Sequence, residues 1–215
     1  MYKYLIFDLD GTLCNSQRGI INSIEYACNK WNFHNYTPEE LLGFIGPPLH
    51  LSFKNKFNLS AEDADAIVRD YRVYYADKGK FENELYDGIF ELLQELHNKS
   101  YKLAIATSKP EGFTLEILEH FGIKNFFDVV VGSTLDNKFS EKADIVNYTL
   151  QQLQPSSKAE CLMIGDRKFD IEGAKACGID CAAVLYGFGN MSEFQQYKPK
   201  YIVESVDELR KLITC

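Results

Sequence analysis

The stretch YLIFDLDGTLCNS, residues 4–16, decides how the rest of the sequence is interpreted. Four apolar or aromatic residues are followed by Asp8, Leu9 and Asp10, and then by Gly11. An uninterrupted apolar run is typical of a strand that is covered on both faces. A buried carboxylate is costly unless another group compensates it. The stretch therefore predicts a buried strand that ends in a site where acids are needed.

The overall composition is that of an ordinary globular protein. The chain has 215 residues, of which 46% are hydrophobic and 25% charged, and this allows one sizeable core with an insertion. Its apolar runs are shorter than the roughly 18 residues of a membrane span, so we expect no membrane partner. A net charge of −8 disfavours binding to nucleic acid polymers, which depends on clustered Lys and Arg. An anionic small molecule would need a local group of donors.

The N-terminal residues and the cysteines both predict a cytoplasmic protein. The sequence MYKYLIFDLDG becomes acidic too early for the apolar region of a secretory signal. The cysteines form no CxxC pair and show no zinc-ligand spacing, so we expect them to be reduced and mostly buried. They are Cys14, Cys28, Cys161, Cys177, Cys181 and Cys215.

Short apolar runs alternate with helical patterns along most of the chain. The expected strands are residues 4–8, 101–108, 127–132, 160–166 and 181–187, with one near Tyr201. Helical patterns begin near Asp87, Glu111, Ser140 and Ser205. Ser205 and Glu208 form a capping box, and Gly122 and Gly178 stand where helices should end. The alternation predicts an α/β fold, a parallel sheet with helices on both faces.

One region departs from this alternation. Residues 19–80 contain only helical patterns, including a helix that starts with Thr37 as cap and Pro38 at its first position. We therefore predict an all-helical domain inserted into the α/β core. The expected bounds are residues 1–15 and 84–215 for the core, 16–83 for the inserted domain, and 14–18 and 81–87 for the hinges.

Polar residues follow four of the expected strands. They are Asp8 and Asp10 after the first strand, Thr107 and Ser108 at the end of the second, Lys142 at the helix after the third, and Asp166 and Asp170 after the fourth. The carboxyl ends of parallel strands share one rim of the sheet, where ligands bind. We therefore expect these residues to converge on a single site.

Four acids in one site predict a bound cation. Two carboxylates repel by up to about 4 kcal/mol at about 4 Å when the effective dielectric is about 20. Lys142 alone cannot balance them, whereas Mg²⁺ binds carboxylate oxygens together with substrate phosphate. The predicted Mg²⁺ site comprises Asp8, Asp10, Asp166 and Asp170. The Thr107 hydroxyl and the Lys142 ammonium suit the oxygens of a phosphoryl group in transfer.

The motifs DLDGT, ATSKP, EKADI and MIGDRKFD, in this order, resemble those of the haloacid dehalogenase-like hydrolase superfamily. The resemblance extends over the whole chain and is strongest to the phosphoglycolate phosphatase-like branch, to which the segment FIGPPL, residues 44–49, is also similar. It implies a Rossmann-like doubly wound parallel sheet with an inserted helical cap. It also implies a Mg²⁺-dependent phosphatase acting on a small phosphate ester.

The resemblance assigns a role to each site residue. Asp8 would be the nucleophile that forms an aspartyl-phosphate. Asp10 would protonate the leaving alkoxide and then take a proton from the attacking water. Lys142 would orient Asp8. The implied phosphate-binding residues are Asp8, Gly11, Thr107, Ser108 and Lys142. The implied Mg²⁺ ligands are Asp8, the backbone carbonyl of Asp10, Asp166 and, directly or in the second shell, Asp170.

Several alternatives stay open at this point. Lys138 competes with Lys142 for the role of catalytic lysine, and the alternative for Asp170 is to cap its helix or to pair with Arg167 or Lys168. The predicted function is hydrolysis of a phosphoglycolate-like ester or a nucleoside 5′-monophosphate. The alternatives are a phosphoglucomutase-type phosphotransferase and a non-catalytic phosphate-binding module. The motifs specify neither the physiological ester nor the oligomeric state.

Overall fold

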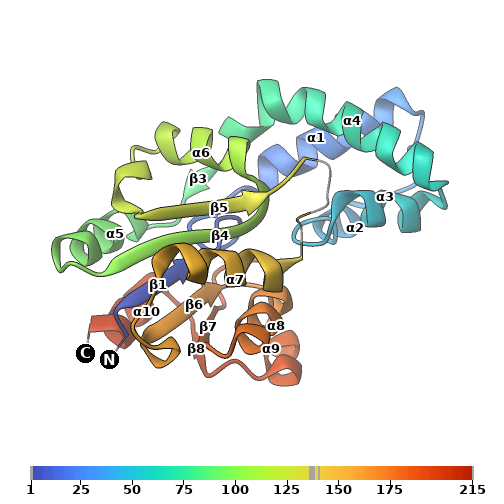
Figure 1. Ribbon diagram of the computed structural model, residues 1–215. Helices are drawn as coiled ribbons and strands as arrows, with labels where there is room; N and C mark the ends of the chain where they lie inside the picture. The colour runs from blue at the N-terminus through green and yellow to red at the C-terminus, as the bar shows by residue number, and fades with distance from the viewer. Residues whose placement is uncertain (1, 136–138, 140, 215) are drawn as a thin grey trace. The chain divides into compact units, whose positions relative to one another are not determined.

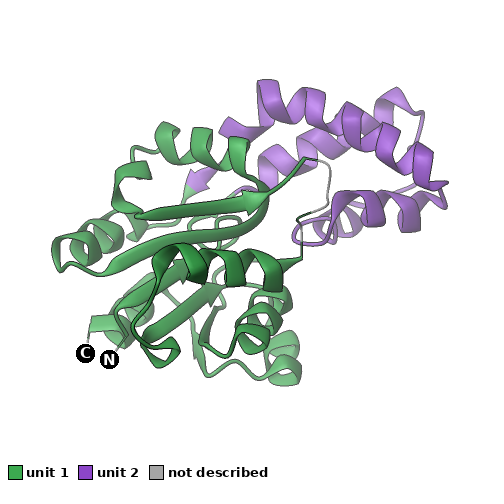
Figure 2. Cartoon of the chain, in the orientation of Figure 1, with its two compact units in different colours: residues 1–15, 85–215 green, residues 16–84 purple. Residues whose placement is uncertain are grey.

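In a computed structural model, which describes residues 2–135, 139 and 141–214, the chain divides into two compact units (Figure 2). The sheet unit comprises residues 1–15 and 85–215, and the helical unit comprises residues 16–84. The sequence places the second boundary after residue 83. Each unit has buried side chains of its own.

The sheet unit contains six parallel strands in the order β5-β4-β1-β6-β7-β8 (Figure 1). They are β1 Tyr4–Phe7, β4 Lys102–Pro110, β5 Val129–Ser133, β6 Cys161–Gly165, β7 Asp180–Val184 and β8 Tyr201–Val203. The first strand of the sequence thus lies in the interior of the sheet, between β4 and β6. The connections run outward from β1 in both directions, so the predicted doubly wound parallel α/β fold is confirmed.

Helices cover both faces of this sheet because successive side chains of a strand point to opposite faces. Leu5 and Phe7 belong to a core formed with α5, α6 and α10, whereas Ile6 belongs to a second core formed with α7, α8 and α9. The helices are α5 Ile89–Asn98, α6 Glu111–His120, α7 Lys142–Leu153, α8 Lys168–Cys177, α9 Met191–Tyr197 and α10 Val206–Thr214. Each fully buried Leu, Ile or Phe contributes about 1.5–3 kcal/mol to this packing.

The helical unit consists of α1 Gln17–Lys30, α2 Pro38–Leu42, α3 Leu49–Phe57 and α4 Ala61–Asp77, followed by a 3₁₀ turn at Gly79–Phe81. α4 packs against α1 and α3, and Ile24, Phe53 and Ile67 are fully buried. The Thr37 hydroxyl accepts a hydrogen bond from the Glu40 amide at the start of α2, with Pro38 at the first helical position. That start is the one predicted.

Some elements differ from the sequence-based expectations. α3 and α9 are not among the helices that the sequence predicts, and of α8 the sequence predicts the end before Gly178. The expected strand 181–187 is wrong at its end, because β7 stops at Val184. The next residues form a loop in which the Phe188 amide donates a hydrogen bond to Asp166 Oδ2 at 2.7 Å. Two short strands, β2 Cys14–Asn15 and β3 Glu84–Leu85, form a separate pair.

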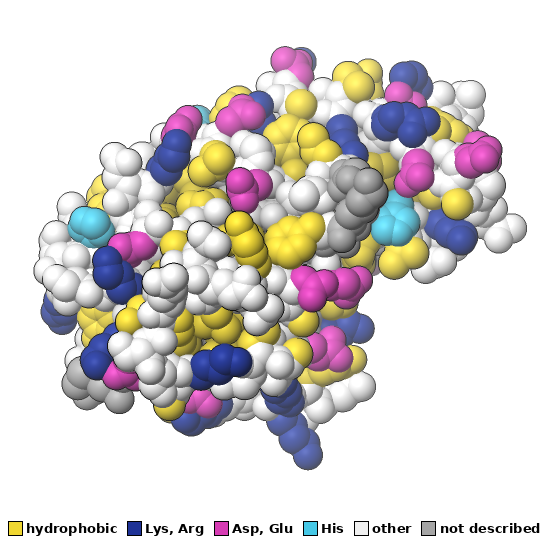
Figure 3. All heavy atoms as spheres, viewed as in Figure 1, with side chains coloured by type: hydrophobic (Ala, Val, Ile, Leu, Met, Phe, Trp, Pro, Cys, Tyr) yellow, Lys and Arg dark blue, Asp and Glu magenta, His cyan; other side chains and the backbone are white. Residues whose placement is uncertain are grey.

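The five described cysteines are free and buried, as the sequence predicts, and Cys215 lies outside the described residues. Of the helices in the described part of the chain, none combines the length and the apolarity required to span a membrane. Acidic and basic side chains are interspersed over the face seen in Figure 3, a distribution typical of a solvated surface.

The predicted cap of α10 provides a test of the sheet unit. The Ser205 hydroxyl accepts a hydrogen bond from the Glu208 amide at 3.2 Å, while Glu208 Oε2 accepts one from the Glu204 amide at 2.8 Å. We expect Ser205→Ala to lower the free energy of unfolding by about 1 kcal/mol, because an amide at the helix start loses its acceptor. Ser205→Thr should retain most of the stability. Urea unfolding followed by circular dichroism measures both, and equal stability of the two variants would contradict the cap.

Candidate active site

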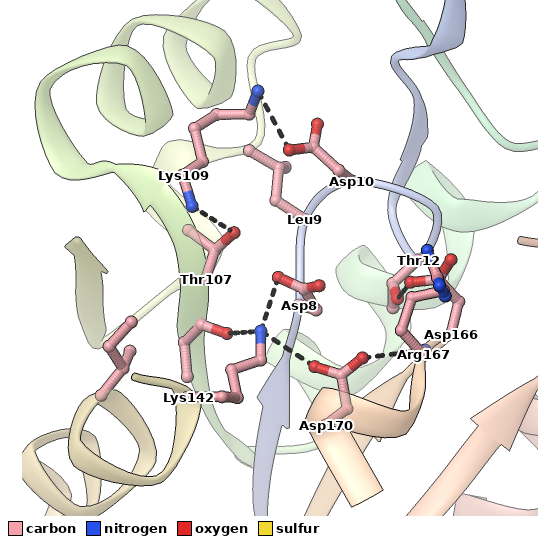
Figure 4. Close-up of polar contacts among 12 residues, drawn as sticks. Asp8, Leu9, Asp10, Thr12, Thr107, Lys109, Lys142, Asp166, Arg167 and Asp170 are labelled. Carbon is pink, nitrogen blue, oxygen red and sulfur yellow. Dashed lines mark hydrogen bonds and ion pairs between the residues drawn. The ribbon is translucent and has the colours of Figure 1, made fainter. Parts of the chain in front are cut away.

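Asp8 stands at the centre of the rim formed by the carboxyl ends of the strands. Its backbone amide donates to the carbonyl of Ile164 at 2.9 Å, which continues the pairing of β1 with β6 for one residue beyond the strand. Its side chain is 13% exposed. Because β4 and β6 flank β1, the segments 106–110 and 165–170 lie on either side of Asp8 (Figure 4).

Lys142, at the start of α7, makes three polar contacts in this site. Its Nζ lies 2.9 Å from Asp8 Oδ1 and 2.9 Å from Asp170 Oδ1, and it donates to the carbonyl oxygen of Ala106 at 2.8 Å (Figure 4). These partners match the three protons of an ammonium group. Burial alone would lower the pKa of Lys142, but the charges of Asp170 and Asp8 outweigh it and raise this pKa. Lys142 is therefore charged. Lys138, the competing lysine, lies outside the described residues.

Asp8, Asp166 and Asp170 form a cluster in which one carboxylate oxygen from each lies within 4.8 Å of the others. Asp166 and Asp170 are almost completely buried. Burial raises the pKa of Asp166 well above its usual range, and the charges of Asp170 and Asp8 add to this effect. Burial, opposed by Lys142, raises the pKa of Asp170 to about 6. The surroundings therefore disfavour the charged form of these two carboxyl groups.

This cluster fits a hard divalent cation. Three carboxylates around one point, of which those of Asp166 and Asp170 are buried, supply the oxygen ligands that Mg²⁺ prefers, and a cation there would relieve their repulsion. The Asp10 side chain is not part of the cluster, so its predicted contribution to a metal site depends on its backbone carbonyl alone.

Asp170 has two kinds of partner. Its Oδ2 accepts a hydrogen bond from the Arg167 amide at 3.0 Å, as in a helix cap, and its Oδ1 pairs with Lys142. The Arg167 side chain instead pairs with Glu193, with Nε 3.2 Å from Oε1. Asp170 therefore both caps its helix, as one sequence-based alternative proposed, and belongs to the carboxylate cluster.

The backbone approaches Asp166 very closely at three glycines. Gly11 has a φ of +79°, and a Cβ there would lie 2.1 Å from Asp166 Oδ2. A Cβ at Gly187 would lie 2.4 Å from Asp166 Cβ, and one at Gly189 would lie 1.9 Å from the Asp166 carbonyl oxygen. The sequence analysis singled out Gly11 but not the other two. In the sequence, the glycine-rich run YGFGN indicates a loop at these two positions. Strand and turn patterns do not show that this loop returns to the site.

The end of β4 supplies Thr107 and a lysine that the sequence analysis did not single out. Thr107 is buried, and its Oγ1 accepts a hydrogen bond from the Lys109 amide at 3.3 Å. The Lys109 side chain is buried too, with Nζ 3.0 Å from Asp10 Oδ2. Ser108, expected to bind phosphate, is exposed between these two buried residues. The sequence could have indicated Lys109, because alternate side chains of a strand point to the same face and Lys109 is two residues after Thr107.

The site thus contains two buried lysines, of which the sequence analysis considered only Lys142. Lys109 pairs with Asp10, whereas Lys142 contacts Asp8 and Asp170. The arrangement offers a carboxylate held by an ammonium group, a second carboxyl group two residues away, and a buried hydroxyl on the neighbouring strand. These are the groups that covalent phosphoryl transfer requires.

Comparison with known proteins identifies the family of the chain. Residues 5–184 match the model of a family described as haloacid dehalogenase-like hydrolase. A structure described as a predicted phosphatase from Clostridium acetobutylicum is 43% identical with a TM-score of 0.93, covering 99% of this chain and 98% of that one. A 5′-nucleotidase from Pseudomonas aeruginosa is 34% identical over 99% of this chain and 96% of its own length. Tyrosine-protein kinase PtkA from Mycobacterium tuberculosis is 37% identical over 98% of this chain and 72% of its own length.

The buried contacts of Lys142 predict a large effect on stability. We expect Lys142→Met, measured in chelator, to lower the free energy of unfolding by about 3 kcal/mol, because it leaves two buried carboxylates without their cation. Lys3→Met is the matched control. It removes an exposed lysine, 2.5 Å from Glu160, and should change stability little. A Lys142→Met variant as stable as Lys3→Met in urea unfolding would contradict the proposed charge balance.

Proposed function

Because the chain belongs to the haloacid dehalogenase-like hydrolase family and is a phosphatase, we propose that it hydrolyses a small phosphate monoester with Mg²⁺ and that Asp8 becomes phosphorylated. The observation that carries this proposal is the position of Asp8. It lies at the central strand end, in contact with Lys142 and clustered with Asp166 and Asp170.

The reaction has two steps. In the first, an Asp8 carboxylate oxygen bonds to phosphorus as the bond from phosphorus to the leaving oxygen breaks, and Asp10 gives its proton to that oxygen. In the second, Asp10 takes a proton from water, and the oxygen of that water displaces Asp8 from phosphorus. Inorganic phosphate leaves and both acids return to their starting states.

The other residues bind and orient the reacting groups. The Lys142 ammonium fixes the Asp8 carboxylate, since it also contacts Asp170 and the Ala106 carbonyl oxygen. The Thr107 hydroxyl binds a phosphoryl oxygen. Asp8, Asp166, Asp170 and the Asp10 carbonyl would hold Mg²⁺, which when bound offsets the charge of the phosphoryl oxygens.

We assign residues 16–83 the role of a cap that governs substrate choice and excludes water during turnover. The segment 44–49, FIGPPL, is the part of the cap that we expect to contact the leaving group. The relative named 5′-nucleotidase supports nucleoside 5′-monophosphates as substrates, alongside phosphoglycolate-like esters.

A second candidate function is transfer of the phosphoryl group to an acceptor other than water. The observation that favours it is the mycobacterial relative, which is named a tyrosine-protein kinase and is 37% identical. The same phosphorylated Asp8 would serve both reactions, because only the acceptor of the second step differs. Release of inorganic phosphate, measured against phosphorylation of an added hydroxyl acceptor, distinguishes the two.

The nucleophile role predicts the effect of a minimal substitution. We expect the protein to release phosphate from p-nitrophenyl phosphate in Mg²⁺, and Asp8→Asn to lower kcat by about 10³-fold or more, because an amide is a poor nucleophile. Excess chelator should abolish the wild-type activity. Activity that survives in Asp8→Asn, or that persists in chelator, would contradict the nucleophile or the metal, respectively.

The metal site has a test that does not depend on turnover. At a hundredfold excess over its Kd, Mg²⁺ should raise the Tm of the wild type by about 5–10 °C. Asp166→Asn should lose this shift, since it removes a clustered carboxylate. Asp10→Asn should keep the shift but lose most turnover. Thermal denaturation with Mg²⁺ and with chelator measures all three, and an unchanged shift in Asp166→Asn would contradict the site.

A further inference from the structure

We propose that Lys109 is a positioning residue that fixes the Asp10 carboxyl group so that Oδ1, and not Oδ2, exchanges the proton with the leaving oxygen. This inference rests on the proposed function, in which Asp10 is the general acid. It adds a residue that none of the roles above includes.

The first observation is the buried ion pair. Lys109 Nζ lies 3.0 Å from Asp10 Oδ2, and the two side chains are 5% and 19% exposed (Figure 4). An exposed ion pair would be mobile and screened by solvent, whereas an ion pair between largely buried groups is screened much less. The contact therefore holds Oδ2 in one place.

The second observation is the state of the other oxygen. Asp10 Oδ1 is buried and has no hydrogen-bond partner within the described part of the chain. A buried acceptor without a donor is unfavourable, so this oxygen is poised for a partner other than the described residues. The leaving oxygen of a bound ester, or the water that follows it, is such a partner.

The third observation connects Lys109 to the phosphoryl group. Its backbone amide donates to Thr107 Oγ1 at 3.3 Å, so one residue contacts both the proposed phosphate-binding hydroxyl and the proposed general acid. The pairing of β4 with β5 shifts register between Ala106 and Pro110. Thr107 and Lys109 therefore lie in an irregular part of the strand. Lys109 thus sets the proton donor at a fixed place relative to phosphorus. Misplacement of such a group by about 1 Å can cost about 10²-fold in rate.

A purely structural role makes different predictions from a positioning role. If Lys109 only anchored the end of β4, its loss would slow every substrate by a similar factor. If it acts through Asp10, its loss should lower kcat/KM, which covers only the steps up to departure of the leaving oxygen, and only when that oxygen needs a proton. An acidic phenol departs without help, whereas a more basic phenol does not.

The experiment compares p-nitrophenyl phosphate with unsubstituted phenyl phosphate, two esters of similar shape with different leaving-group acidity. We expect Lys109→Met to lower kcat/KM for phenyl phosphate by about 10–100-fold and for p-nitrophenyl phosphate by less than about 3-fold. Lys109→Arg should recover most of the loss. Lys102→Met is the matched control, because Lys102 lies on the same strand in an exposed pair, 2.5 Å from Asp128, and should show the wild-type ratio.

A double-mutant cycle tests whether Lys109 acts through Asp10. In the Asp10→Asn background, Lys109→Met should cause no further selective loss, because the group that it positions is already disabled. Lys109→Gln, which keeps a donor of smaller size, replaces Lys109→Met if that variant does not fold. The Mg²⁺-dependent shift in Tm of each variant shows that the carboxylate cluster is intact.

The outcomes separate this inference from the proposed function. Equal loss of kcat/KM for both esters, additive loss in the Asp10→Asn background, or wild-type kinetics in Lys109→Met would overturn the role of Lys109 while leaving the phosphatase intact. A wild-type protein that hydrolyses neither ester would overturn the proposed function, and this inference with it.

Discussion

The shared ammonium group of Lys142 is the interaction on which the site depends. It contacts Asp8, Asp170 and the Ala106 carbonyl oxygen, and so joins the end of β1, the start of α8 and strand β4. Without it, two buried carboxylates would face each other beside a third, at a cost of several kcal/mol. The contact also explains why Gly173 lies on the face of α8 next to α7, since a Cβ there would lie 3.0 Å from Lys142 Cγ.

The topology of the sheet makes this concentration of charge possible. β1 lies between β4 and β6, so the chain must cross the sheet in both directions from its first strand. The carboxyl ends of these three strands then meet at one place, where residues more than a hundred positions apart become neighbours. The close approach of Gly11, Gly187 and Gly189 to Asp166 shows how tightly the loops pack there. The fold provides a rigid frame, and the loops bring the acids to it.

Sequence patterns were sufficient for the fold and for much of the candidate site. Apolar runs separated by helical patterns predict the parallel sheet, and polar residues after strands predict where Asp8, Thr107, Lys142 and Asp166 converge. The patterns failed where a segment is shaped by distant partners. The run 181–187 is apolar enough for a strand, yet its end becomes a loop that packs on Asp166. Lys109 was overlooked because nothing in the local sequence indicates that this lysine is buried. Its burial follows from its contact with Asp10, which only the structure shows.

The sequence by itself determined the order of strands and helices, the family and the set of acids, because these depend on local periodicity and on motifs that are contiguous in the chain. Only the tertiary structure decided which partner each charge has. Asp10 pairs with Lys109, whereas Asp8 and Asp170 share Lys142. The physical reason is that ion pairs in a buried site depend on distances of about 3 Å between remote segments, and local sequence contains no information about such distances.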